Sequence, residues 1–318
     1  MIPDRSLHRS GSINFQMKFL PTVYKYIFAT LLFLPLIIGC AEKTVVRNET
    51  FISFTSETDE VASRAPFIDL SSDIVNFTVW GNYDGTPVFT AQEVVRVDQL
   101  WEYTPLQRWI LSADQYDFSA YTPVGAGTPN VIGNRLASID VDCNATQQDL
   151  VMAYTIVPKA EIGRTVLMTF RHPLSAIKFS LALNGNFDYR QTYKIISVRW
   201  DNVYTEGTFT LNSDNTIFTN HTGSAKETVP ITEFSGSTLS TTSKVESDFL
   251  FVIPQTSKDA VLRLVLEING ERKEIVKLVP IEWESGKKYT YNISIDPFEI
   301  TIETTPWEVP ETEDIIIR

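Results

Sequence analysis

Apolar and polar residues alternate strictly in many short segments after residue 65, and this alternation predicts β-strands with one buried face. In one such segment, Ile177 and Phe179 fall on one face while Lys178 and Ser180 fall on the other. The clearest cases are IKFSLAL (177–183), VLRLVLEI (261–268) and YTYNISI (289–295). We therefore expect these segments to lie in sheets that cover a hydrophobic core.

Turn-forming residues separate the predicted strands. The clusters GNYDGTP (81–87), PVGAGTPN (123–130) and NGER (269–272) supply the Gly, Asn, Asp and Pro that hairpin turns need. No segment after residue 40 keeps a helical period convincingly. Many short strands, with no helices to cover parallel crossovers, predict an all-β fold made of antiparallel β-sandwiches.

The length of 318 residues predicts two domains in tandem. We expect the boundary near IVPKAEIGR (156–164), where a proline and a charged stretch separate two runs of strands. This gives an N-terminal sandwich at 65–160 and a C-terminal sandwich at 161–318. A hydrophobic content of 43% is enough to fill both cores.

The region before these domains has the pattern of an export signal. We take Met17 as the start and residues 1–16 as a mis-called extension. Two lysines then precede an uncharged apolar run, so 17–39 is predicted to be a signal peptide. Its ending, LIIGC, resembles a bacterial lipobox, which makes Cys40 the predicted lipidated N-terminus and membrane anchor. The alternative is an ordinary secretion signal followed by a chance cysteine.

The charge of the chain argues against one function, and its cysteine content excludes one means of stabilisation. The net charge of −12 argues against a nucleic-acid-binding surface. Besides Cys40, the chain contains only Cys143, so the exported protein has no internal disulfide available.

Residue sets for catalysis or metal binding are missing from the sequence. It contains no HExxH, CxxC, G-x-S-x-G, GxGxxG or P-loop motif, so an enzyme is disfavoured and no cofactor or metal is expected. Outside the extension the histidines are His172 and His221. His172 could be a ligand or a base, but without a second histidine or a cysteine nearby it is interpreted as a side chain at the edge of a sandwich. Asp140 and Asp142 could hold a cation, but a solvated strand face is the simpler interpretation. The many aromatic residues leave one alternative open, a lipid-anchored surface module that binds glycans and does not polymerise.

Several segments, taken in order, resemble one known family. They are a lipobox leader, an SRA step (63–65), WEYTPLQRWILSADQYDFSAYTP (101–123), QQDLVMAYT (147–155), LMTFRHPLSAIKFSL (167–181), FVIPQT (251–256) and WESGKKYTYNISI (283–295). This order is similar to that of the fimbrillin-like family, the subunits and accessory proteins of type V pili of Gram-negative anaerobes. The resemblance covers nearly all of the mature chain.

The resemblance implies both a fold and a mode of assembly. It implies two transthyretin-like β-sandwich domains and export as an outer-membrane lipoprotein of the cell surface or fimbrium. An arginine-specific protease then removes an N-terminal segment, and subunits polymerise by strand exchange. Cys40 matches the lipidated cysteine, and the bond between Arg64 and Ala65 matches the cleavage site. The implied partners are other pilus subunits, the protease, the outer membrane, and a host or bacterial surface ligand.

The residues of the N-terminal segment (40–64) support this mechanism. Val46, Ile52 and Phe54 share one parity, so they can point into a core together. At about 1.5–3 kcal/mol for each buried side chain, they represent roughly 4–9 kcal/mol. Losing this strand would leave a domain in need of a replacement. Between it and the domain, TSETDEVASR (55–64) is polar and suits an exposed loop. The alternative for Arg64 is an incidental linker arginine.

The C-terminal segment (298–318) is the expected donor strand. Phe298, Ile300 and Ile302 fall on one face, and Trp307 and Val309 supply two further apolar anchors. Prolines at 306 and 310 count against a long central strand. The alternative is that this segment is the last strand of its own domain, with a frayed tail.

Overall fold

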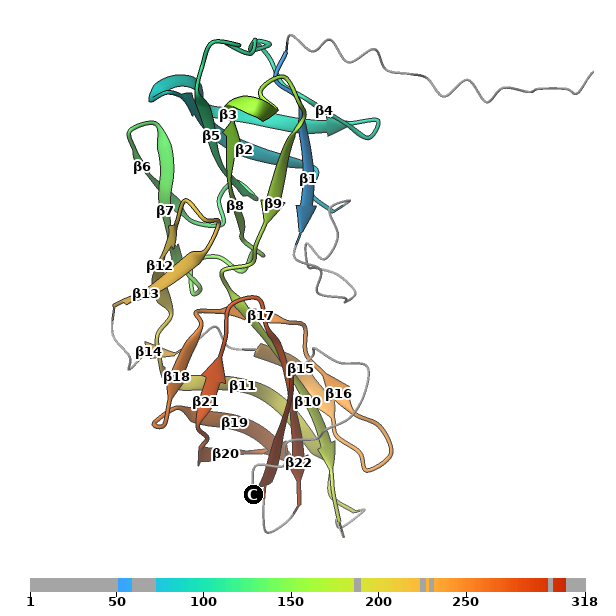
Figure 1. Ribbon diagram of the computed structural model, residues 1–318. Helices are drawn as coiled ribbons and strands as arrows, with labels where there is room; N and C mark the ends of the chain where they lie inside the picture. Colours follow the sequence, from blue (N-terminus) through green and yellow to red (C-terminus); the bar gives the residue numbers. More distant parts are fainter. Residues whose placement is uncertain are drawn as a thin grey trace, which may run out of the picture. The chain divides into compact units, whose positions relative to one another are not determined.

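The computed structural model describes residues 51–58, 73–185, 190–223, 227–228, 232–296 and 300–306. Across these residues the chain forms β-strands and a single 3-10 turn, Lys159–Glu161. Most strand pairs are antiparallel (Figure 1), so the all-β expectation is confirmed. Two pairs, β1 with β9 and β10 with β22, are parallel.

A five-stranded antiparallel sheet organises the N-terminal part. Its order is β4-β3-β2-β5-β8. The bounds are β2 Asn76–Tyr83, β3 Thr86–Val97, β4 Leu100–Glu102, β5 Gln115–Thr122 and β8 Val151–Pro158. A separate pair, β1 (Phe54–Thr58) and β9 (Val166–Phe170), lies over one face of this sheet and shares its core.

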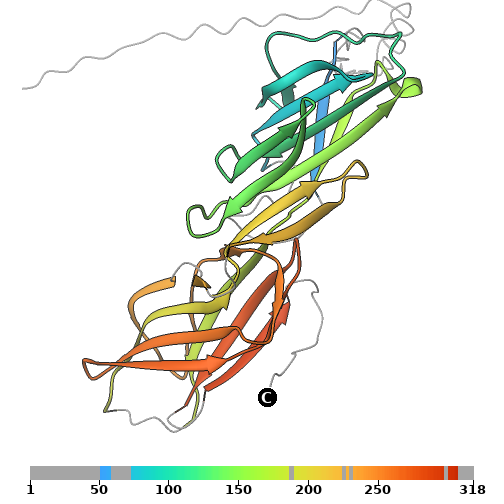
Figure 2. The same ribbon diagram turned by 90° about the vertical axis from the view of Figure 1, so that its left-hand side faces the viewer.

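A four-stranded sheet combines strands from both halves of the sequence. Its order is β13-β12-β7-β6, with β6 Thr128–Ile132, β7 Arg135–Asp142, β12 Glu206–Leu211 and β13 Ile217–Thr222. The β12–β13 hairpin lies beside the β6–β7 hairpin (Figure 2), and β12 pairs with β7 along Glu206↔Asp142 to Thr210↔Ser138. The two halves of the chain are therefore joined by backbone hydrogen bonds.

Two five-stranded sheets form the C-terminal sandwich. The first contains β10 Ser175–Leu183, β16 Val245–Glu246, β17 Leu250–Val252, β22 Lys288–Ile295 and β23 Ile300–Pro306. The second contains β11 Tyr193–Val203, β14 Glu227–Thr228, β15 Thr232–Thr238, β19 Val261–Ile268 and β20 Glu271–Leu278. A short pair, β18 Gln255–Ser257 and β21 Ile281–Trp283, completes this part.

Three hydrophobic cores follow from the alternation of side chains. The C-terminal core lies between the two five-stranded sheets and contains the inward residues of β10, β11, β19 and β22. The N-terminal five-stranded sheet is covered on both faces. Phe77 and Val79 enter the core shared with β1 and β9, whereas Trp80 enters a middle core with β7 and β12. Successive side chains of β2 thus serve two cores.

Strand β9 belongs to the N-terminal core although it follows residue 160. Val166, Met168 and Phe170 are buried among the side chains of β2, β3 and β5. The structure thus groups β9 with strands that precede the expected boundary, and the division of the chain at that point stays a prediction. Within the described residues there is no helix of the length and apolar character that a membrane span requires.

Candidate strand-exchange site

The segment 51–58, which includes β1, packs on the N-terminal core between β9 and the loop after β4, and we call the place that it fills the groove. Strand β9 holds one edge of this segment. The two strands run parallel, from Phe54↔Val166 to Thr58↔Phe170. Residues 55–58 were expected to belong to an exposed loop, and this was wrong, because their backbone pairs with β9. The Val166 amide also donates to the Ser53 carbonyl oxygen at 2.7 Å. Figure 1 shows β1 beside β9, far from it in the sequence. The strand is therefore attached to a partner more than 100 residues away.

The other edge of this segment is held by the loop that follows β4. The Ile52 amide donates to the Gln107 carbonyl oxygen at 2.9 Å. The Tyr103 hydroxyl donates to the Ile52 carbonyl oxygen at 2.7 Å, and this contact is buried. The Arg108 guanidinium lies over the Phe51 ring, 4.8 Å from its centroid. Residues 51–53 are thus bonded on both sides, as in an inserted strand.

Two side chains of this segment fill the groove. Ile52 is 2% exposed and Phe54 is 5% exposed. The Phe54 ring makes edge contacts with four aromatic rings at centroid distances of 5.6 to 5.9 Å, those of Phe77, Phe89, Tyr103 and Phe118. Edge-to-face pairs of this kind add to the energy of burial. Phe54 is therefore the central side chain of an aromatic cluster.

Two polar contacts fix the outer face of the same pair of strands. The Ser53 and Thr165 hydroxyl oxygens are 3.0 Å apart. The Thr169 hydroxyl donates to Glu57 Oε1 at 2.6 Å. Ser53 and Glu57 are four residues apart, as are Thr165 and Thr169, so both contacts agree with a single register.

Burial also affects the hydroxyl that clamps this segment. Desolvation raises the pKa of Tyr103, and the hydrogen bond with the Gln107 backbone opposes this shift. The phenol therefore keeps its proton near neutral pH, where it can donate to the Ile52 carbonyl oxygen. The sequence interpretation missed Tyr103 and Gln107, because the segment EYTPLQ (102–107) has no strand alternation.

The residues predicted to take part in strand exchange lie in the groove, in β23, or outside the described residues. Ile52 and Phe54 lie together in the groove. Ile300 and Ile302 belong to β23, which pairs antiparallel with β22 of its own sheet, and Ile302 is 3% exposed in the C-terminal core. The remaining predicted sites lie outside the described residues: Cys40, Val46, Arg64, Ala65, Phe298, Trp307 and Val309.

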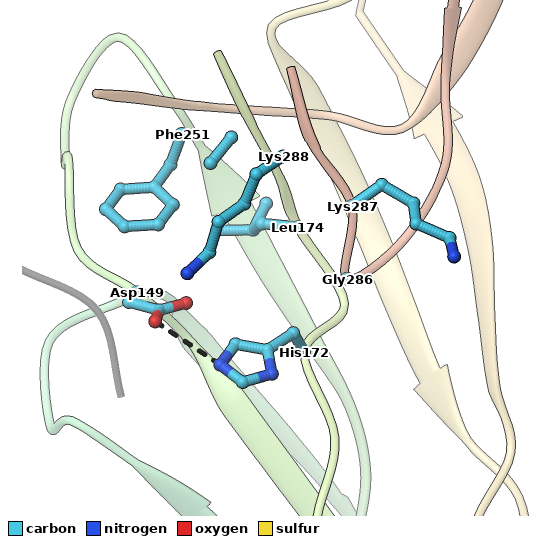
Figure 3. Close-up of a pocket in the computed structure, with 8 residues that line it drawn as sticks. Asp149, His172, Leu174, Phe251, Gly286, Lys287 and Lys288 are labelled. Carbon is cyan, nitrogen blue, oxygen red and sulfur yellow. Dashed lines mark ion pairs between the residues drawn. The ribbon is translucent and has the colours of Figure 1, made fainter. Parts of the chain in front are cut away.

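A second cluster of functional groups lies between β8, β9 and β22 (Figure 3). Asp149, His172 and Lys288 are all less than 9% exposed. His172 Nε2 is 3.4 Å from Asp149 Oδ2. The cavity that these residues line has a volume of about 10 Å³, which is room for about one water molecule. The cluster can pair buried charges, but its cavity is too small for a substrate.

The other polar residues considered as possible metal ligands make local hydrogen bonds. Asp140 accepts hydrogen bonds from Asn130 and Thr208, and Asp142 accepts one from the Asn144 amide. No three His, Cys, Asp or Glu residues of the described chain are grouped so as to hold a metal ion. His221 Nε2 is 2.7 Å from the Pro254 carbonyl oxygen.

The aromatic residues do not form an exposed row on the described surface. Among the described Phe, Tyr and Trp side chains, Phe218 on β13 alone falls in the exposed class, at 65%. The others contribute to the cores or are partly covered. A platform of several rings for stacking sugars is therefore not found in this part of the chain.

Comparison with known proteins places this arrangement in context. The sequence model of a family described as fimbrillin-like matches residues 76–308. A search of the curated proteins found no match.

Solved structures share the fold at low sequence identity. A fimbrial protein from Bacteroides vulgatus is 13% identical with a TM-score of 0.55, and the match covers 80% of this chain and 98% of that one. A putative cell adhesion protein from Bacteroides uniformis is 14% identical with a TM-score of 0.55, covering 82% and 98%. A third, from Bacteroides ovatus, is 15% identical with a TM-score of 0.55, covering 84% and 98%.

Proposed function

Because the chain belongs to the fimbrillin-like family, we propose that it is a pilus subunit or pilus-associated surface lipoprotein that binds its neighbours by exchange of a β-strand. The observation that carries this proposal is the seating of β1. Residues 51–53 are bonded on both edges, β1 is paired with β9, and Ile52 and Phe54 are buried, whereas residues 59–75 connect β1 to β2. The structural neighbours are described as fimbrial and cell adhesion proteins, which agrees with a place at the cell surface.

Loss of the segment 51–58 would uncover the apolar groove that Ile52 and Phe54 fill. Burial of Ile52 and Phe54 contributes roughly 3–6 kcal/mol at ordinary values for large apolar side chains. A domain is stable by only about 5–15 kcal/mol. Removal of the segment would also expose the rings that surround Phe54 to water. An incoming strand that covers them restores this energy, which drives assembly.

A single proteolytic cut would have two effects. The proposed anchor, Cys40, and strand β1 both precede the proposed cleavage site, the bond between Arg64 and Ala65. Cleavage there by an arginine-specific protease would break the covalent link that joins the body of the protein to its lipid and to β1. Displacement of the cut segment would then release the body from the outer membrane and open the groove for assembly.

The proposed donor is the C-terminal segment, 298–318, of a second subunit. Its strand β23 lies at the edge of its sheet, after β22 in the order β16-β10-β22-β23. An edge strand is paired along one side only, so it can leave without opening an interior ladder. The alternative interpretation, a glycan-binding module, is less well supported because Phe218 is isolated on the described surface.

The cleavage site gives the direct test. Brief treatment of the folded protein with an arginine-specific protease, followed by N-terminal sequencing, should give a fragment that begins APFIDL, from Ala65. The Arg64→Ala variant should resist cleavage and stay monomeric, whereas Arg272→Ala, on the exposed face of β20, should be cut normally. A first cut at another site, or normal processing of Arg64→Ala, would contradict the assignment.

A further inference from the structure

The groove contains groups that can distinguish one strand from another. Its floor takes apolar side chains at the positions of Ile52 and Phe54. Its outer rim presents the hydroxyl groups of Thr165 and Thr169, which contact Ser53 and Glu57. An occupant must therefore have two apolar residues separated by one residue, and polar residues beside both threonines.

Backbone geometry adds a further requirement. The amide and carbonyl groups of one residue point to the same edge of a strand, and the edges alternate along the chain. The Ser53 carbonyl oxygen faces β9 and the Ile52 groups face the opposite loop. Positions 53, 55 and 57 consequently turn their amides toward β9. Proline at any of these positions would remove a hydrogen-bond donor.

From these contacts we propose that Thr165 and Thr169, together with the apolar floor that Ile52 and Phe54 cover, select the strand and its register, and that they select residues 300–305 of a second copy. This inference rests on the proposed strand exchange. The proposed register aligns residue 300 with position 52, so that Ile300 and Ile302 take the places of Ile52 and Phe54. Thr301 and Thr305 then stand beside Thr165 and Thr169, with no proline at a position that faces β9.

The tail beyond β23 fits the groove less well. With Trp307 and Val309 in the two apolar places, Pro310 falls at position 55, where an amide should face β9. If Trp307 instead takes the place of Phe54, Pro306 and Pro310 fall at positions 53 and 57, beside both threonines. The ITIETT segment (300–305) meets every requirement that ISFTSE (52–57) meets, and the tail does not.

Peptide binding to the full chain tests the selection. The mature protein is cut after Arg64, and fluorescent peptides FISFTSET (51–58), EITIETTP (299–306) and PWEVPETE (306–313) are offered as replacement strands. The first two should displace the cut segment, and the third should bind at least tenfold more weakly. Thr165→Val and Thr169→Val should each weaken binding of the first peptide about fivefold, because each removes one hydrogen bond. Replacing Thr55 by Ala within this peptide is the matched control and should change nothing.

Disulfide trapping tests the register. Full chains carrying Thr165→Cys and Thr301→Cys should form cross-linked multimers after cleavage, whereas Thr165→Cys with Glu299→Cys, two residues out of register, should not. Cross-linking through position 299 alone would overturn the register. Equal binding of all three peptides, or binding unaffected by both threonine variants, would overturn the selection. If the cut protein takes up no peptide at all, the strand-exchange function itself is wrong.

Discussion

Replacing Phe54 by alanine tests how much of the N-terminal domain depends on β1. The ring is 5% exposed and contacts four other aromatic rings. Truncation of a buried phenylalanine costs about 3–5 kcal/mol. The surrounding rings are themselves packed together, since Tyr116 stacks on Phe118 and Trp109 meets both. They cannot collapse easily into the space, so we expect a cost in the upper part of this range.

The assay is scanning calorimetry of the uncut protein. A loss of that size lowers the melting temperature of a domain by roughly 6–20 °C. Thr55→Ala, on the exposed side of the same strand, is the matched control and should change stability by less than about 0.5 kcal/mol. The C-terminal sandwich has its own core, so any transition that it shows separately should not move.

A small effect would refute the reasoning. If Phe54→Ala lowers the free energy of unfolding by less than about 1 kcal/mol, the aromatic cluster does not depend on β1 and the groove gains little from being filled. After cleavage, the variant should also lose its N-terminal fragment faster than the original protein does. Equal retention of both fragments would contradict the seating of Phe54.

Three further predictions concern other parts of the chain. Cys40→Ala should leave the signal peptide uncut and remove the protein from the detergent phase in a partitioning assay, and normal partitioning would contradict lipidation. Deleting 304–318 shortens the proposed donor strand and removes Thr305, so it should give a folded monomer that forms fewer heat-resistant multimers after cleavage; failure to fold, or undiminished assembly, would assign the segment to its own domain. Cys143 is fully buried and burial raises the pKa of its thiol, so iodoacetamide should label it only after unfolding, as mass spectrometry would show.

The strands and their buried faces could be predicted because alternation is a local property. Ile177, Phe179, Leu181 and Leu183 share one face in the sequence, and all four are buried in the C-terminal core. Ile52 and Phe54 were likewise expected to enter a core, and they do. In each case a period of two was enough to assign the buried side.

The partners of these strands could not be predicted in the same way. Tyr103 contacts the backbone of Ile52 across 51 residues, from a loop without periodicity. The pairing of β7 with β12 joins the two halves of the chain, and no local pattern indicates it. Asp149 and His172 meet only because the strands around them pack together. Such contacts depend on topology, which alternation does not encode.

The parallel pairing of β1 with β9 has a consequence for biosynthesis. Ser53 and Thr165 are 112 residues apart in the chain. At about 5–20 residues per second, a ribosome takes roughly 6 to 22 s to add a stretch of that length. Contacts of such long separation also form slowly once both partners exist. Strand β1 is thus made before the other described strands of its core, and it waits for β9, the last of them. A nascent or newly exported chain carries an apolar strand with open edges throughout that interval, and this is when a holding chaperone would have most to protect.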